Sequence, residues 1–334
     1  MAVSRTHRRR SGRTRRLTAL AAAGAVVALA GTAVKPEATA AAAGATDTSS
    51  DPVVVAAGDI STRTLLGGNL LTSDVVRSLN PDAVVTMGDN QYPDGSLRDF
   101  NTYYDATWGR FKSITHPSPG HHEYYTDPGA TGYFGYFGAA ANPRNPGCNS
   151  DCSGYYSWDI GTWHMVALNT NGDDCGYVAC DASSAQVAWL KADLARSSQP
   201  CVAAYFADPR WSSGTKHGNN PSLGPIWDAL YAAGADVVLN GHEHLYERFA
   251  KQAPSGQASD RGVRQFTIGT GGNGALYDLG NILPNSQAQN NNSRGVLRLA
   301  LHDGSYGWSF EPALGDTFRD SGADTCNPKG GAGV

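Results

Sequence analysis

Two histidines separated by one residue follow an apolar run in the C-terminal third of the chain. The run from Ala235 to Asn240 is mostly apolar and β-branched, so it predicts a buried strand that ends at Gly241. If the strand continued, His242 and His244 would share one face, because side chains two positions apart point the same way. A turn beginning at the glycine would instead spread the two imidazoles around a cluster of metal ions.

Three further segments end in residue types that commonly bind metals. Two Val-rich runs, residues 52–57 and 83–87, stop at Gly-Asp pairs, and a third segment ends in Gly-His-His-Glu. A glycine at such a position permits a sharp turn and lets the backbone approach an ion closely. Because the carboxyl ends of neighbouring strands converge on one crevice in open α/β sheets, we expect the polar side chains to meet there. They are Asp59, Asp89, Tyr92, His121, His122, His242 and His244.

This mixture of donors predicts a transition-metal site. Carboxylate, phenolate and imidazole groups together suit Fe, Zn or Mn better than an all-oxygen calcium site. Taken singly, a Gly-Asp pair after a strand is more often a turn, and a lone histidine is more often a surface or structural residue. Here four of the nine histidines fall in two Gly-led pairs, and two Gly-Asp pairs each end a Val-rich run. That clustering favours a metal site over four unrelated turns.

The order of the motifs resembles the calcineurin-like metallophosphoesterases, and within them the purple acid phosphatase-like branch of secreted bacterial type. The resemblance extends over about residues 52–312 and implies an α/β fold, a two-sheet sandwich flanked by helices. It also implies hydrolysis of phosphate esters by a metal-activated hydroxide. The motifs are Gly58-Asp59, Gly88-Asp89-Asn90-x-Tyr92, Gly120-His121-His122-Glu123 and Gly241-His242-x-His244-x-Tyr246-Glu247-Arg248.

The resemblance further implies a dinuclear centre, with Fe in one position and Zn, Mn or Fe in the other. Asp59, Tyr92 and His244 would hold the first metal. Asp89 would bridge the two metals, and His242 would bind the second one.

Two positions depart from the family pattern, and both concern the second metal. The third motif normally carries an asparagine ligand where this chain has His121, and the fourth normally begins with a histidine where this chain has Ala207. Either His121 binds through its imidazole while Asp208 supplies a carboxylate, or the second site is weakened or empty. Neighbouring strand residues point to opposite faces, so only a loop would bring Asp208 into the site.

Other residues near these motifs are expected to act without binding metal. His122 matches the family's non-ligand histidine and would protonate the leaving oxygen or stabilise transition-state charge. Glu123 would orient a neighbouring histidine by a hydrogen bond. Glu243 should face away from the two imidazoles beside it. His217 either touches substrate or is an exposed loop residue.

The predicted function is therefore hydrolysis of a small phosphate ester by a secreted metal-dependent enzyme. Ala207 motivates one alternative, a weakened or inactive single-metal or metal-free homologue with the same fold. Another alternative is a phosphodiesterase or phospholipase-type enzyme that uses the same site.

The N-terminus has the three-part form of a secretory signal. Residues 1–16 hold seven arginines and no acid, residues 17–34 are uncharged and apolar or small, and small residues follow. We expect residues 1–40 to be a signal peptide, 41–51 a linker and 52–312 the catalytic domain. The Arg15-Arg16 pair is also compatible with twin-arginine export. An uncleaved anchor is the alternative, although the apolar run is marginal for spanning a bilayer.

Charge and cysteine usage agree with an exported hydrolase. Outside residues 1–40 the chain has 18 basic and 29 acidic side chains, which argues against broad nucleic-acid binding. Six cysteines suit an oxidising compartment better than zinc binding. Several pairings are possible, and the favoured ones are Cys148 with Cys152, Cys175 with Cys180, and Cys201 with Cys326. The last would pin the tail, residues 313–334.

Local patterns predict the remaining elements. Ser183 and Gln186 fit a capping box before a helix, and a second helix is expected over residues 225–233. Strands are expected over residues 265–268, 295–301 and 306–310, with the last two forming a hairpin at Asp303-Gly304. Residues 120–160, rich in Gly, Tyr and Asn, predict a long loop region that shapes the crevice.

Overall fold

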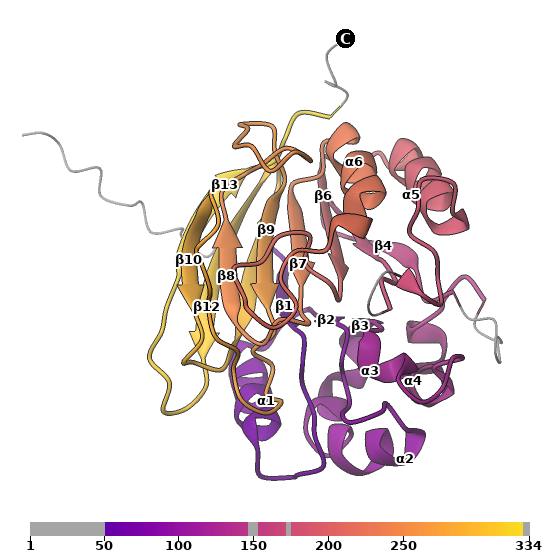
Figure 1. Cartoon of the computed structure of the whole chain (residues 1–334), viewed down its shortest axis with the longest axis vertical. Helices are drawn as coiled ribbons and strands as arrows, with labels where there is room; N and C mark the ends of the chain where they lie inside the picture. The colour runs from indigo at the N-terminus through magenta and orange to yellow at the C-terminus, as the bar shows by residue number, and fades with distance from the viewer. Residues whose placement is uncertain (1–50, 146–152, 172–174, 330–334) are drawn as a thin grey trace, which may run out of the picture. The chain divides into compact units, whose positions relative to one another are not determined.

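The computed structural model describes residues 51–145, 153–171 and 175–329 (Figure 1). The predicted signal peptide and nearly all of the predicted linker lie outside these ranges, as do Cys148 and Cys152. Among the described residues, no helix is both long enough and apolar enough to cross a membrane.

The strands of the described residues form two mixed sheets (Figure 1). In the first sheet the order is β13 (Ser321–Thr325), β12 (Ser305–Pro312), β11 (Gly295–His302), β1 (Val53–Ala57), β2 (Ala83–Met87) and β3 (Thr115–Ser118). In the second the order is β10 (Ser286–Asn290), β8 (Tyr246–Phe249), β9 (Arg264–Ile268), β7 (Val237–Asn240), β6 (Cys201–Phe206), β5 (Trp163–Ala167) and β4 (Tyr156–Ile160). Parallel pairing joins β1 to β2 to β3, and β5 to β6 to β7 to β9.

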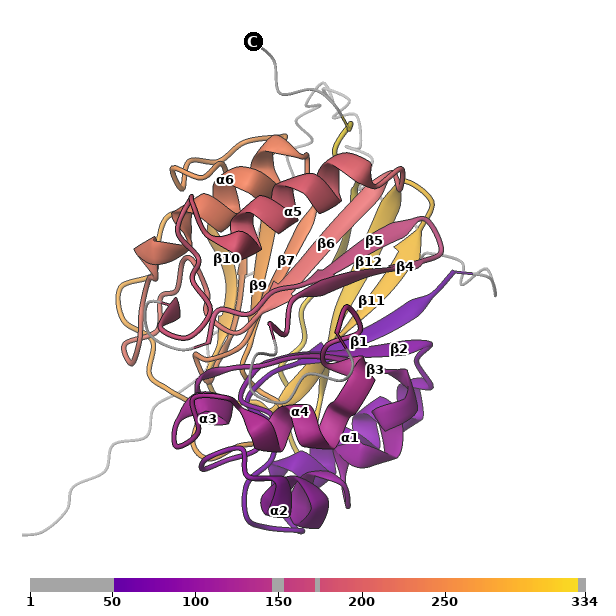
Figure 2. The same cartoon turned by 90° about the vertical axis from the view of Figure 1, so that its right-hand side faces the viewer.

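Helices lie on both sides of this pair of sheets (Figures 1 and 2). The α-helices are α1 (Gly68–Leu79), α2 (Leu97–Asp99), α3 (His121–Tyr124), α4 (Thr131–Phe137), α5 (Ala185–Arg196) and α6 (Gly224–Ala232). Short 3₁₀ or π segments cover Phe100–Tyr104, Trp108–Ile114, Gly138–Ala140 and Pro221–Leu223. Figure 2 shows α5 and α6 side by side over the second sheet, while α1 lies against β11 and β12 of the first.

Burial follows the sequence pattern of each strand. The central strands β2, β5, β6 and β7 are buried along their whole length, as expected for parallel strands covered on both faces. The hairpin strands β11 and β12 alternate between buried and partly exposed residues, which is typical of antiparallel strands with one covered face. One apolar core therefore fills the space between the sheets, and a second lies under α5 and α6.

The predicted two-sheet sandwich flanked by helices is confirmed, and so are most of its elements. The strands before Asp59, Asp89 and Gly241 are present, and residues 303 and 304 form the turn of the predicted hairpin. The predicted capping box of Ser183 and Gln186 was wrong. The cap of α5 is Ser184, whose hydroxyl accepts from the Val187 amide, and Gln186 binds Asn169 instead of closing a capping box.

Residues 120–160 also contain more regular structure than predicted. Helices α3 and α4 and strand β4 lie in this range. The sequence of α4, Thr-Gly-Tyr-Phe-Gly-Tyr-Phe, has weak helix propensity, but its aromatic residues are buried and contact one another and Phe100. Tertiary packing therefore outweighs local propensity here. The same packing places Tyr133 and Phe134 in the core, away from any substrate pocket.

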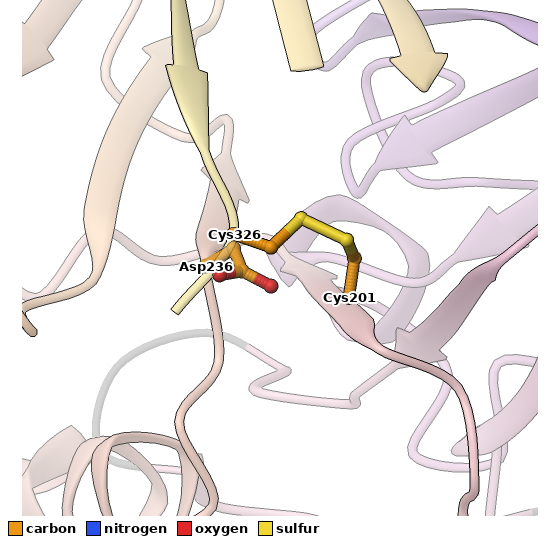
Figure 3. A group of neighbouring side chains, drawn as sticks. All are labelled: Cys201, Asp236 and Cys326. Carbon is orange, nitrogen blue, oxygen red and sulfur yellow. A yellow bond between two sulfur atoms is a disulfide. The ribbon is translucent and has the colours of Figure 1, made fainter. Parts of the chain in front are cut away.

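The C-terminal segment belongs to the folded unit. Strand β13 pairs with β12, and Cys326 just after it forms a disulfide with Cys201 at the start of β6 (Figure 3). Asp236 lies beside this disulfide, and its carboxylate accepts from the amides of Val202 and Asn327. Burial raises the pKa of Asp236 to about 7, although the two amides oppose the rise. Both sulfur atoms are used in the bond, so this group is a covalent tie. The predicted Cys175–Cys180 disulfide is also present.

The contacts of His164 are expected to stabilise the fold to an extent that depends on pH. Its Nδ1 lies 2.7 Å from Asp159 Oδ1, and its Nε2 lies 2.9 Å from Asp193 Oδ2. Burial lowers the pKa of His164, but the bonds to the two carboxylates outweigh burial and raise it. The stabilisation is therefore complete below the unfolded-state pKa, about 6.5, and is lost as pH rises through the raised pKa of the folded state.

We expect the difference in melting temperature between wild type and His164→Gln to shrink as pH rises above about 6.5. His116→Gln is a suitable control, because burial lowers the pKa of His116 to about 4 and leaves it neutral across this window. If the difference in melting temperature between wild type and His164→Gln stays constant with pH, the imidazolium is not the stabilising species.

Candidate metal centre

The predicted ligand residues follow the carboxyl ends of β1, β2, β3 and β7, with His121 at the start of α3 and the others in loops. Glycines bring these loops into backbone contact. A Cβ added to Gly58 would lie 3.0 Å from Gly241 Cα, and one added to Gly88 would lie 2.6 Å from Gly120 Cα. Only glycine permits such close approach. The loops of the two sheets therefore meet at one point.

Asp59, Tyr92 and His244 form a buried cluster of donor atoms. Tyr92 Oη donates to Asp59 Oδ1 at 2.6 Å and lies 3.0 Å from His244 Nε2. His244 Nε2 is also 3.1 Å from Asp59 Oδ1. Three side chains from three separate loops thus point one oxygen or nitrogen atom each at the same place. This donor set fits a cation of the Fe, Zn or Mn type.

Asp89 lies between this cluster and the remaining histidines. Its Oδ2 is 3.3 Å from Tyr92 Oη and 3.6 Å from His242 Nδ1. Its Oδ1 accepts from the amide of His122 at 2.8 Å. One carboxylate oxygen therefore faces both groups of donors, as a bridging ligand must. The turn at His242, whose φ is 66°, separates the two imidazoles of the last motif.

The second group of donors surrounds His242. The ring of His121 lies 6.1 Å from that of His242, centroid to centroid. On the other edge of the His242 ring, Nε2 is 3.9 Å from Asp208 Oδ1. Strand β6 ends at Phe206, so Asp208 lies in a loop and is free of the strand alternation that would turn it away. Ala207 is buried and contributes no donor atom.

The loop of residues 213–218, called the covering loop below, lies over this second group, and a small cavity lies beside it. The ring of His217 is exposed and lies 3.9 Å from that of His242. A cavity of about 310 Å³ opens between the loop and the site. Its lining consists of Asp208, Pro209, His217, Gly218, Asn219, Asn220, Pro221 and His242.

Electrostatics at the centre are those of buried acids next to imidazoles. Burial, followed by the charges of Asp59 and Asp89, raises the pKa of Tyr92. Burial opposes charge on His242, but the Asp208 charge and the contact with Asp89 outweigh it and raise its pKa to about 10. Burial likewise opposes ionisation of Asp89, yet the His242 contact and the His122 charge lower its pKa. Several buried carboxylates therefore attract positive charge at one point, which fits a cation site.

Glu123 differs from its predicted role. Its carboxylate reaches no imidazole and instead accepts from backbone amides, those of Asp89, Asn90, Gln91 and Gly120. It is completely buried beneath the loop that carries Asp89 and Tyr92. Its physical effect is to fix the backbone of two motifs, because four N–H groups converge on one side chain.

Two residues at the centre were missed by sequence reasoning. Thr170 donates to Asp208 Oδ2 at 2.7 Å and thereby leaves Oδ1 directed at His242. It follows β5 in an Asn-Thr-Asn run, a polar strand end of the kind that marked the other motifs. Tyr277 stacks on His244 with ring centroids 4.0 Å apart, and its amide donates to the His244 carbonyl. No local pattern marks Tyr277.

Comparison with known proteins agrees with this geometry. Residues 52–246, more than half of the chain, match the calcineurin-like phosphoesterase family. The chain belongs to that family. The predicted resemblance is therefore confirmed.

Several relatives of this calcineurin-like phosphoesterase are purple acid phosphatases. It is 30% identical to purple acid phosphatase 15 of Arabidopsis thaliana over 240 residues, 62% of this chain and 44% of that protein. It is 27% identical to human acid phosphatase type 7 over 185 residues, 50% of this chain and 40% of that protein. The chain thus spans less than half the length of these relatives.

The fold matches solved structures as well. Purple acid phosphatase PPD1 from yellow lupin seeds superposes with a TM-score of 0.63 at 18% identity, covering 83% of this chain and 54% of that one. At this identity the match shows a shared fold.

Proposed function

We propose that this calcineurin-like phosphoesterase hydrolyses phosphate esters at a centre of two metal ions. The observation that carries the proposal is the buried contact of Asp59, Tyr92 and His244, with an oxygen of Asp89 3.3 Å from the phenol. Bound metal ions at such a site would neutralise the anionic ester and supply hydroxide near neutral pH.

The candidate ligands divide into two groups, one for each metal ion. Asp59, Tyr92 and His244 would hold the first cation, and Asp89 would be shared between the two. His242 and His121 would hold the second. The metals expected are Fe with Zn, Mn or Fe.

Asp208 acts on His242 from the opposite edge of the ring. Its Oδ1 faces Nε2, whereas Asp89 faces Nδ1. One ring edge is therefore directed at the shared carboxylate and the other at Asp208. A carboxylate at the second nitrogen of a ligating histidine helps to fix its orientation and raises its basicity, and at 3.9 Å Asp208 would do so through its charge. This geometry favours an orienting role for Asp208 over a direct replacement for the missing histidine ligand.

We propose that His122 acts as the proton donor. Its Nδ1 lies 2.6 Å from the carbonyl oxygen of Pro93, which can only accept, so Nδ1 carries a proton. Its ring packs on Tyr92 with centroids 4.0 Å apart. When the ring carries both protons, Nε2 holds the one that can pass to a leaving oxygen, a contribution worth about 10²–10⁴-fold in rate. His217 faces the same centre from the covering loop, and we propose that it contacts the ester.

The test combines turnover with metal analysis. Purified protein is assayed with chromogenic phosphate monoesters and diesters in the presence of Mn²⁺, Zn²⁺ or Fe, and bound metal is counted per chain. We expect metal-dependent turnover, and the ratio of the two substrates identifies a monoesterase or a diesterase. Fewer than one metal per chain and no turnover with any added metal would overturn the proposal and support the inactive homologue.

Tyr92 offers a separate optical readout. A ferric ion held by the Tyr92 phenolate is expected to give a visible absorption band, and Tyr92→Phe should abolish it. A band that persists in Tyr92→Phe would exclude this phenolate as the ligand of an iron in the first position.

We also propose that the protein is exported. The arginine-rich and then apolar N-terminal sequence supports this proposal, and so do the disulfides Cys175–Cys180 and Cys201–Cys326.

A further inference from the structure

Glu243 lies in the chain between His242 and His244, yet its side chain serves a different loop. It is completely buried, and its Oε1 accepts from the amides of His217 and Gly218, both at 2.7 Å. The two neighbouring imidazoles contact Asp89 and Asp59 instead. The prediction that Glu243 faces away from the imidazoles is consistent with these contacts, but they add a function for it.

The covering loop is seated directly on this carboxylate. A Cβ added to Gly214 would lie 2.5 Å from Glu243 Cδ and 2.7 Å from each of its oxygens, so the loop needs a glycine there. At the start of the loop, Glu247 accepts from the amide and hydroxyl of Ser213. Two buried carboxylates from one short segment therefore hold the loop of residues 213–218.

These contacts determine where the His217 ring lies. His217 is an exposed residue. Its backbone is held, because charge-assisted hydrogen bonds to amides are stronger than neutral ones. The ring consequently lies 3.9 Å from His242 and 5.9 Å from Tyr277, at the edge of the cavity beside the metal centre.

We propose that Glu243 is a positioning residue that holds His217 over His242, so that His242 and the covering loop form one unit. This inference rests on the proposed function for its kinetic consequence. Its structural content, the clamp on two amides, does not depend on turnover.

Hydrogen exchange tests the clamp itself. In the wild-type protein, the amides of His217 and Gly218 should exchange slowly despite lying in a surface loop. Glu243→Ala should speed their exchange at least about tenfold, and Glu243→Gln, which keeps one acceptor oxygen, should have a smaller effect. Gly214→Ala should speed the same amides without altering the carboxylate, because its methyl group would displace the loop.

Glu247→Gln provides the matched control. It also changes a buried glutamate that binds the loop, but at Ser213. We expect faster exchange at Ser213 with the amides of His217 and Gly218 still protected. Unchanged exchange at those two amides in both Glu243→Ala and Gly214→Ala would overturn the proposal.

Kinetics test the consequence for His217. Glu243→Ala should lower kcat/KM by about the same factor as His217→Ala, roughly 10²-fold if His217 contacts the transition state. The double variant should lose little more than either single variant, because both remove one contribution. Bound metal should stay at the wild-type level, because the Glu243 carboxylate accepts from amides of the covering loop.

The outcomes separate this inference from the proposed function. A wild-type protein without phosphoesterase activity would refute the function, and the exchange rates would still decide the clamp. Losses in kcat/KM that multiply in the double variant would show that Glu243 acts independently of His217, and the positioning role would be wrong.

Discussion

Asp89→Asn is expected to lower kcat/KM by about 10³-fold or more and to reduce bound metal from two ions per chain. Asparagine keeps the shape of the side chain and an oxygen for the His122 amide, which bonds Asp89 Oδ1 at 2.8 Å. It removes the negative charge at the point that faces both Tyr92 and His242. Because the proposed function has both cations share this carboxylate, the expected loss of several kcal/mol of charge stabilisation would affect the whole centre.

The measurement is steady-state turnover together with metal content by elemental analysis. Asp74→Asn is the control, because it makes the same chemical change in a partly exposed residue of α1 that pairs with Arg77 and Arg110. It should leave both quantities unchanged. Two tightly bound metals and near wild-type turnover in Asp89→Asn would rule out a shared ligand at this position.

Ala207→His is expected to raise the affinity for the second metal at least about tenfold, with a matching rise in turnover at limiting metal. Ala207 is buried beside the second motif, where a Cβ added to Gly88 would lie 2.6 Å from the Ala207 methyl group. An imidazole there would supply the donor that the family pattern has and this chain lacks. Titrating the metal-free protein with metal ion in a calorimeter measures the affinity directly.

Asp208→Asn gives the contrasting result. If Asp208 orients His242 from its Nε2 edge, the variant should weaken the second metal by about 10–100-fold without abolishing its binding. Complete loss of the second metal would instead identify Asp208 as a direct ligand. No gain from Ala207→His, either alone or combined with His121→Asn, would mean that the missing histidine does not limit this site.

Much of the fold could be predicted because its signals are local. The Val-rich runs before Asp59 and Asp89 are short, continuous and apolar, a pattern typical of buried parallel strands. The turn at Asp303-Gly304 was equally clear. The aromatic helix α4 was not, because its stability comes from rings buried against Phe100 and has no periodic signature.

The two glutamates illustrate the limit for the site. Glu123 and Glu243 each stand beside a motif histidine, and from the sequence Glu123 was expected to orient an imidazole whereas Glu243 was expected only to face away from its neighbours. Both carboxylates instead accept backbone amides, from the loop of Asp89 in one case and from the loop of His217 in the other. A backbone amide has no residue-specific signature, so such bonds cannot be predicted from residue types.

The sequence by itself determined the family, the types of metal-binding side chain and their placement at strand ends, because each motif joins a strand pattern to polar residues within a few positions. Only the tertiary structure decided what Asp208, Glu243 and Tyr277 contact. Thr170 directs Asp208 from 38 residues away, and Glu243 holds amides 25 and 26 residues away. Tyr277 stacks on His244 although β8 and β9 lie between them in the sequence. The direction of a loop side chain depends on such distant partners, and no local periodicity records them.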